Sequence, residues 1–187
     1  MKDNYFKTLT IADSQTGRQV KATALANFSL AGWVNFQDSQ YDGTNKLRLT
    51  QNTPTKVTFT QPLLFSNFER EPQIGITKYP IWDITNNKFI SYEENLFGNN
   101  STRLQFVAEA VTAATGVAVE VSLFIPTYLT IYRESKPLVK GTDPQRIVDN
   151  IGFYYDQNTI DNGCEIYLTA VGDDVDIYNI NLYTKNW

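Results

Sequence analysis

One stretch near the middle of the chain alternates too regularly to be a helix. Between Val117 and Ile125 every second residue is Val, Leu or Ile, and Glu120 and Ser122 fall between them. A repeat of two residues is the period of a β-strand, and β-branched residues favour strands. The stretch therefore predicts a strand with one buried face, which needs neighbouring strands to satisfy its backbone hydrogen bonds.

The preceding alanine-rich segment fits two patterns. As a helix it would place Leu104, Val107 and Val111 along one side, and as a strand it would bury every second residue from Leu104 onward. Periodicity alone does not decide between the two. Thr115-Gly116 lies between this segment and the next, where a tight turn favours glycine. We interpret the whole stretch from Leu104 to Pro126 as a β-hairpin.

The same alternation recurs in five other stretches, which are separated by turns rich in Gly, Asn and Asp. These are KVTFTQPLL from Lys56, YLTIYRE from Tyr128, RIVDNIGFYYD from Arg146, GCEIYLTAV from Gly163 and VDIYNINLY from Val175. In the last of them the apolar phase shifts after Ile177, which indicates a β-bulge or a change of the buried face. Many short strands joined by turns predict an antiparallel sandwich or barrel. We expect little helix, with one helical turn near Tyr92–Phe97.

The composition excludes several classes of function. The 187 residues include no histidine and one cysteine, and the net charge is −4. Without histidine the chain lacks the commonest general base and zinc ligand, and Cys164 is interpreted as a buried apolar residue. No basic cluster is present, so we expect no nucleic-acid binding. No apolar run is long enough to span a bilayer and the start does not resemble a signal peptide, which predicts a soluble protein made in a cytoplasm, with no membrane partner.

Acidic groups offer two candidate sites. Asp173, Asp174 and Asp176 could bind calcium through oxygen atoms, but their spacing does not match an EF-hand and a polar turn is the commoner explanation. A glycosidase needs two carboxylates held across a cleft, and nothing marks the pairs Glu93-Glu94 or Glu69 and Glu71 as such. We therefore predict no catalytic residue, no metal site and no cofactor.

Aromatic residues are abundant, with eleven Tyr, eleven Phe and three Trp. Rigid amphipathic rings can stack on sugars, but in an all-β protein most are expected in the core or at a subunit interface. The candidates for sugar stacking are Trp33, Trp82, Tyr154, Tyr155 and Trp187. The sequence alone does not place a sugar site.

The first part of the chain differs from the rest. RQVKATALANFSLAGW, which begins at Arg18, alternates small apolar residues, and it predicts an edge strand or an arm that lies along another subunit. We divide the chain into an N-terminal arm or strands, residues 1–45, and a main β domain, residues 46–187. Partner binding is assigned to aromatic residues in the first segment, namely Tyr5, Phe6, Phe28 and Trp33.

A series of short motifs is distributed in order along residues 32–187. They are Trp33 with Asp38, the pair Asn52-Thr53, the D-x-T-x-N-K turn at Asp83–Lys88, Asn162-Gly163, and D-I-Y-x-I at Asp176–Ile180. Each motif is weak alone, and their order and spacing carry the resemblance. The series resembles a family of phage virion accessory proteins, which includes head-decoration proteins and the knob domains of head fibres.

The resemblance implies an all-β fold, an antiparallel two-sheet jelly-roll sandwich of the tumour-necrosis-factor-like (TNF-like) kind, which commonly forms a homotrimer. It implies a non-enzymatic virion structural protein on the capsid surface, attached to the major capsid protein or another virion protein through its N-terminal region, roughly residues 1–31. The alternative is a host-receptor or glycan-binding knob of a phage fibre. A third hypothesis, a polysaccharide-degrading hydrolase, requires facing carboxylates in a cleft.

Overall fold

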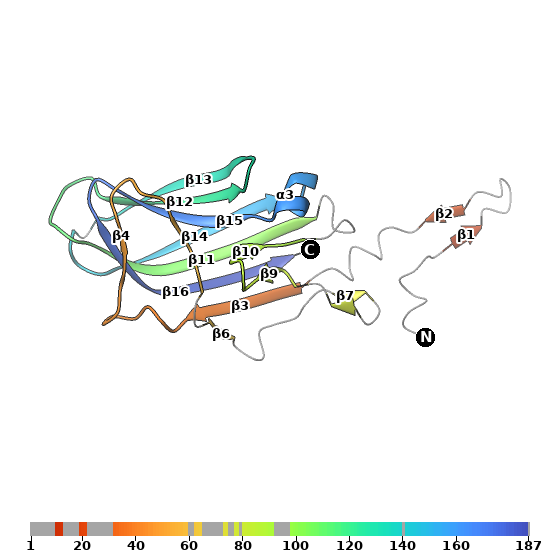
Figure 1. The fold of residues 1–187 in the computed structure, drawn as a ribbon, viewed down its shortest axis with the longest axis horizontal. Coiled ribbons are helices and arrows are strands. Elements are labelled where there is room, and N and C mark those ends of the chain that lie inside the picture. The colour runs from red at the N-terminus through yellow and green to blue at the C-terminus, as the bar shows by residue number, and fades with distance from the viewer. Residues whose placement is uncertain are drawn as a thin grey trace.

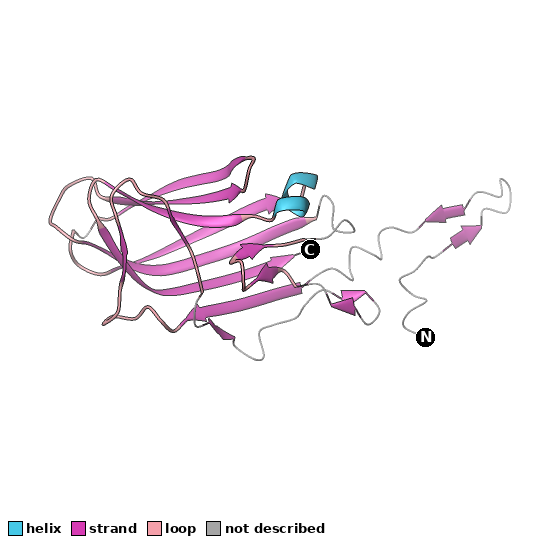
Figure 2. Cartoon of the chain, viewed as in Figure 1, coloured by secondary structure: helices cyan, strands magenta, loops and turns pink. Residues whose placement is uncertain are grey.

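The computed structural model describes residues 10–12, 19–21, 32–59, 62–64, 73–74, 77–78, 80–91, 98–139 and 141–186. Most of these residues form two antiparallel β-sheets that pack face to face (Figures 1 and 2). The sandwich predicted from the alternating pattern is therefore confirmed. Within the described residues, no helix is long and apolar enough to cross a membrane.

The larger sheet has six strands in the order β14-β11-β16-β3-β6, with β4 paired to β16. Its strands are β3 (Gly32–Asp38), β4 (Leu47–Leu49), β6 (Pro62–Leu64), β11 (Asn99–Ala110), β14 (Gln145–Tyr154) and β16 (Val175–Asn186). Strand β3 pairs with the last strand of the chain along its length. The described sheet thus begins at Gly32, inside the segment 1–45 that the sequence assigns to the arm.

The smaller sheet has four strands in the order β13-β12-β15-β5. They are β5 (Thr55–Lys56), β12 (Ala118–Ile125), β13 (Leu129–Pro137) and β15 (Glu165–Val171). Three two-stranded pairs complete the described strands: β1 (Thr10–Ala12) with β2 (Gln19–Lys21), β7 (Gln73–Ile74) with β8 (Thr77–Lys78), and β9 (Trp82–Asp83) with β10 (Lys88–Phe89).

The hairpin predicted from Leu104 to Pro126 is wrong, although both of its halves are strands. Strand β11 pairs with β14 and β16, whereas β12 pairs with β13 and β15, so the two lie in opposite sheets. The side chains of Leu104 and Phe106 on β11, and of Val119 and Val121 on β12, are fully buried. Placing them in opposite sheets lets both apolar faces meet across the core. The connection 111–117 is long enough to cross the roughly 10 Å between packed sheets.

The predicted bulge in the last strand is confirmed. Asn179 has a φ of 53°, and the pairing of β16 with β11 shifts register between Gln105 and Val107. The backbone N–H of Asn179 donates to the carbonyl of Tyr41 at 3.0 Å. The extra residue lets Ile177 and Ile180 both face the core despite their odd spacing.

Trp82 and Tyr155, two candidates for sugar stacking, lie in the core. Trp82 is 5% exposed and Tyr155 is fully buried. The Trp82 ring packs edge-on against Phe59 and Phe89, with centroid distances of 5.9 and 4.8 Å. The backbones of Phe89 and Cys164 exchange hydrogen bonds of 2.7 and 3.0 Å, which fix the β9–β10 hairpin to the start of β15. These rings stabilise the sandwich and present no platform to a ligand.

A short helix, α3 (Gln157–Asn162), occupies a stretch interpreted from sequence as a turn. The carboxylate of Asp156 caps its first turn by accepting from the backbone N–H of Thr159 at 2.8 Å. Gly163 ends the helix with a φ of 74°. The helical turn expected at Tyr92–Phe97 falls outside the described residues.

Gly163 is required for more than its backbone conformation. A Cβ at this position would lie 2.7 Å from the carbonyl oxygen of Phe89, whereas a Cβ at Gly116, whose φ is 76°, would meet nothing within 4 Å. We expect Gly116→Ala to lower the free energy of unfolding by about 1 kcal/mol, through backbone strain alone. Gly163→Ala should cost about 3 kcal/mol. Urea denaturation measures both, and equal losses would contradict the steric argument.

Candidate functional site

The outer face of the larger sheet carries Trp33, which is the one predicted partner-binding residue among those described. Tyr5, Phe6 and Phe28 lie outside the described residues. Trp33 is half-buried on β3 and stands opposite Lys185 on β16. We call this surface the broad face and define it by ten outward side chains on four adjacent strands: Trp33, Asn35, Gln37, Arg103, Gln105, Val148, Asn150, Asn181, Tyr183 and Lys185.

Register aligns the side chains of the broad face in rows across the sheet. Tyr183 stands opposite both Asn35 and Arg103 on its two neighbouring strands. In the adjacent row the amide nitrogen of Asn181 donates to the side-chain oxygen of Asn35 at 3.0 Å. The Gln105 side chain accepts from Arg146 at 2.5 Å. Cross-strand hydrogen bonds therefore hold these amide side chains in fixed positions before any partner binds.

The chemistry of the broad face suits contact with protein. Its defining residues combine Trp33 and Tyr183 with amides and arginine, whereas the outward Glu109 and Asp176, at the other end of the same strands, form ion pairs. The centres of protein interfaces are enriched in Trp, Tyr and Arg and depleted in Asp and Glu. The amides that already have partners, such as Asn35 and Asn181, can be buried at a lower cost than unpaired polar groups. The broad face is therefore a candidate subunit interface.

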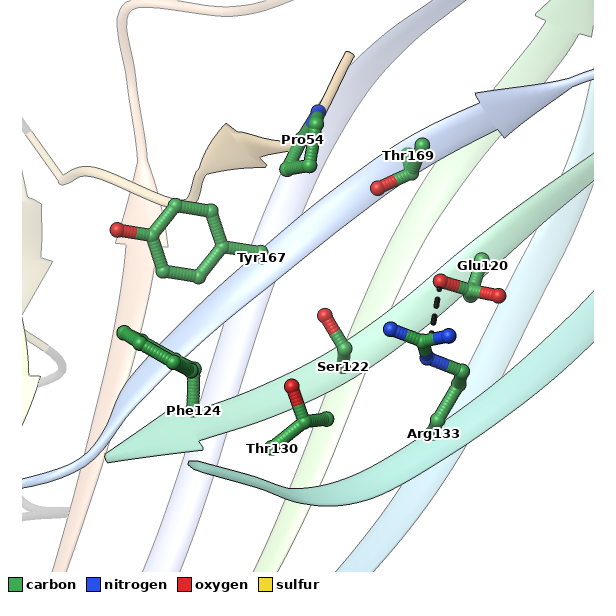
Figure 3. Close-up of a pocket in the computed structure, with 8 residues that line it drawn as sticks. All are labelled: Pro54, Glu120, Ser122, Phe124, Thr130, Arg133, Tyr167 and Thr169. Atoms are coloured by element: carbon green, nitrogen blue, oxygen red, sulfur yellow. Dashed lines mark ion pairs between the residues drawn. The ribbon is translucent and has the colours of Figure 1, made fainter. Parts of the chain in front are cut away.

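A second candidate surface is a groove of about 280 Å³ on the outer face of the smaller sheet (Figure 3). Its lining residues are Pro54, Glu120, Ser122, Phe124, Thr130, Arg133, Tyr167 and Thr169. The rings of Phe124 and Tyr167 meet edge to face at one end, with centroids 6.1 Å apart. At the other end Nε of Arg133 lies 3.3 Å from Oε1 of Glu120. Figure 3 shows the hydroxyl of Ser122 between these two ends.

The hydroxyl of Tyr167 is held in its neutral form. It donates to Oε2 of Glu165 at 2.8 Å, and Nζ of Lys56 lies 2.7 Å from the other oxygen of that carboxylate. Burial, together with the hydrogen bond to Glu165, raises the pKa of Tyr167 to about 12. At neutral pH the groove therefore presents uncharged hydroxyls, two aromatic rings and one ion pair.

The carboxylates of the candidate calcium cluster each have other partners. Oδ2 of Asp173 accepts from the backbone N–H and the hydroxyl of Thr112, at 2.8 and 2.6 Å. Asp174 accepts from the backbone N–H of Gln51 at 2.8 Å, and Asp176 accepts from Arg48. These contacts join the turn to neighbouring segments. Among the described residues, no group of three or more His, Cys, Asp or Glu side chains is arranged to hold a metal ion.

A buried cluster of titratable groups joins the edges of the two sheets. Asp149 on β14 is 1% exposed, and its carboxylate lies 2.8 Å from Nζ of Lys136 and accepts from the hydroxyl of Tyr132 at 2.9 Å. Both partners are on β13, the edge strand of the smaller sheet. Tyr132 and Lys136 also contact Glu134. We call this set the clasp, and the burial of Asp149 makes it a structural link that a substrate would not reach.

The clasp shifts two pKa values upward. Burial, with the hydrogen bonds to Glu134 and Asp149, raises the pKa of Tyr132 well above its usual range. Burial opposes the charge on Lys136, but hydrogen bonds to Asp149 and Glu134 outweigh it and raise its pKa. The raised pKa of Lys136 contributes stability that is present at neutral pH and is lost as pH rises above its unfolded value of 10.5.

Of the aromatic residues that sequence reasoning proposed, Trp33 belongs to the broad face. Tyr154, a candidate for sugar stacking, lies on β14 and is 69% exposed, whereas Trp187 is outside the described residues. The acidic pairs Glu93-Glu94 and Glu69 with Glu71 are also outside them. Sequence reasoning missed the remaining members of the broad face and the groove. Alternation marked them as outward-facing, but register and sheet order, which bring them together, are not readable from the pattern.

Comparisons with known proteins support the fold and do not assign a family. No family model matches the chain, and no curated protein matches it. The structure of Eiger TNF from S. frugiperda is similar with a TM-score of 0.51 and 8% identity, over 83% of this chain and 91% of that one. A similarity at such low identity shows the fold alone, and it confirms the predicted TNF-like jelly-roll sandwich.

Two viral structures are more distant. The PRD1 vertex protein P5 has a TM-score of 0.41 at 12% identity, over 82% of this chain and 95% of that one. A structure of the Gt strain of infectious bursal disease virus has a TM-score of 0.41 at 7% identity, over 96% of this chain and 37% of that one. Neither TM-score is high enough to carry an argument.

The clasp gives a testable contribution to stability. We expect Asp149→Asn to lower the free energy of unfolding by about 3 kcal/mol, because it removes the buried charge that faces Lys136. Glu134→Gln changes an acid to an amide in the same cluster, but the side chain is 49% exposed and the expected cost is under about 1 kcal/mol. Urea denaturation measures the free energy of unfolding of both variants. A loss for Asp149→Asn as small as that for Glu134→Gln would show that the clasp does not stabilise the fold.

Proposed function

We propose that this chain is a non-enzymatic structural protein of a phage virion, which decorates the capsid or forms a head fibre, and that it assembles as a homotrimer. The broad face is the observation that carries this proposal. It is an ordered sheet face with aromatic, amide and arginine side chains, suited to burial against other copies of the chain. The ordered motifs that resemble phage virion accessory proteins support the location on a virion.

The broad face would form the trimer contact. A closed ring of three copies requires two different patches on each copy to meet, one on each side of the three-fold axis. The broad face spans β3, β16, β11 and β14, so its two ends offer different side chains to the two neighbours. Trp33 lies on β3, toward one end, and Asn150 lies on β14 at the other. A stable contact of this kind buries roughly 1,200–2,000 Å².

The N-terminal region would attach the trimer to the particle. In the described residues, β1 and β2 pair with each other and with no strand of the sandwich (Figure 1). Among the described residues, the first strand of the larger sheet begins at Gly32. The residues before it, including Tyr5, Phe6 and Phe28, would contact the major capsid protein or another virion protein. This division leaves the jelly roll free to trimerise.

Light scattering of the purified protein tests the trimer. The expected molar mass is three times 21.3 kDa. Tyr183→Glu places a charge in the centre of the broad face, and we expect it to give a monomer, because removing a carboxylate from water at the contact carries a large desolvation cost. Thr53→Glu is the control, since Thr53 is exposed on a loop whose neighbour Gln51 bridges to the smaller sheet, and it should keep the trimer mass. A monomeric wild-type protein would contradict the proposal.

A truncation tests the attachment. We expect a chain lacking residues 1–31 to keep the jelly roll folded and trimeric, because the described sheet begins at Gly32. The same chain should fail to join virus particles when it replaces the full-length protein during infection. Particle-bound protein is measured by gel electrophoresis of purified virions, with full-length protein as the control. Normal incorporation of the truncated chain would show that the arm is not the attachment segment.

A further inference from the structure

We propose that the groove on the smaller sheet is a binding site for a neutral saccharide of one or two pyranose rings. The groove lies on the opposite layer of the sandwich from the broad face. Saccharide binding would therefore add to the structural role and does not depend on it. Three features of the groove support the proposal: the strands of its floor are fully paired, its side chains match a sugar ring, and it carries no net charge.

The floor of the groove excludes recognition by strand addition. Ser122 and Phe124 belong to β12, which is hydrogen-bonded on both sides, to β13 and to β15. Tyr167 belongs to β15, which pairs with β12 and with β5. A bound peptide strand needs a free sheet edge with unpaired backbone groups. At this floor the ligand must instead be recognised by side chains.

The side chains match the two kinds of surface that a sugar ring presents. The rings of Phe124 and Tyr167 supply an apolar wall against which the C–H face of a pyranose can pack. Sugar hydroxyls both donate and accept hydrogen bonds. The hydroxyl of Ser122 can do the same, Glu120 accepts and Arg133 donates. Figure 3 shows these groups on one side of the sheet, with the aromatic rings and the ion pair at opposite ends.

Charge and size narrow the ligand further. Glu120 and Arg133 neutralise each other at 3.3 Å, and the Tyr167 hydroxyl is protonated at neutral pH. The groove therefore offers no excess positive charge to a phosphate, a sulfate or an acidic sugar. Its volume of about 280 Å³ is just below the roughly 300–1,000 Å³ typical of sites for drug-sized ligands. A ligand of one or two neutral rings fits these limits.

Titration of the full-length protein with defined sugars tests the proposal. The neutral probes are methyl α-glucoside, methyl α-mannoside, methyl β-galactoside, N-acetylglucosamine and lactose, and sialyllactose is the acidic probe. Saturation-transfer NMR reports contact, and amide shifts report the site. We expect at least one neutral probe to bind saturably with a Kd of about 1 mM and to shift the amide signals of Phe124 and Tyr167.

Variants link the binding to the groove. Arg133→Gln changes a side chain that is 63% exposed and should leave the fold intact, and Tyr167→Ala removes half of the aromatic wall. Each substitution should raise the Kd of the neutral probe about tenfold. Tyr183→Glu, on the opposite sheet, should bind it normally even as a monomer, which separates this test from that of the trimer. The proposal is overturned if no neutral probe binds at about 50 mM, if sialyllactose alone binds, or if both groove variants bind normally.

Discussion

The structure depends on the burial of two apolar sheet faces against each other. Strand β11 presents apolar side chains to the core from Leu104 to Ala110, and β12 does so along its length. Each large apolar side chain contributes roughly 1.5–3 kcal/mol when it leaves water. Both rows must be buried away from water. The chain therefore crosses from one sheet to the other between β11 and β12, so that the two rows face each other. The chain crosses again after β13, β14 and β15, so that β14 and β16 join the larger sheet while β13 and β15 join the smaller one. The aromatic rings around Trp82 then fill part of the remaining core.

Two of the motifs on which the resemblance rests, the turn at Asp83–Lys88 and Asn162-Gly163, have a structural role. Oδ1 of Asp83 accepts from the backbone N–H groups of Thr85 and Asn86, at 2.9 and 3.0 Å, and shapes the turn at Asp83–Lys88. In the same turn Lys88 donates to the carbonyl of Asn162 at 3.0 Å, next to the glycine that approaches Phe89. Two motifs that are distant in the sequence thus contact each other in the fold. Such motifs identify a fold, whereas function depends on the surfaces that the fold presents.

The two outer faces of the sandwich differ in chemistry, and this difference supports separate roles. The broad face consists largely of aromatic and amide side chains, some of the amides held by cross-strand hydrogen bonds, which suits a permanent protein contact. The groove is smaller and combines rings, hydroxyls and an ion pair, which suits a weak and reversible ligand. The clasp around Asp149 joins the sheet edges between these faces. Its ion pair between Asp149 and Lys136 holds the edges of the two sheets together.

The sequence by itself determined the strands, their inward faces and the bulge near Asn179, because alternation and turn residues act over short distances. It also indicated that Trp33 could face a partner. Only the tertiary structure decided that β11 and β12 lie in opposite sheets. It also placed Tyr183 on the same face as Trp33, and Tyr167 in the same groove as Phe124. Strand partners and register are set by long-range burial, which a local pattern does not encode. The surfaces proposed for function arise from that pairing.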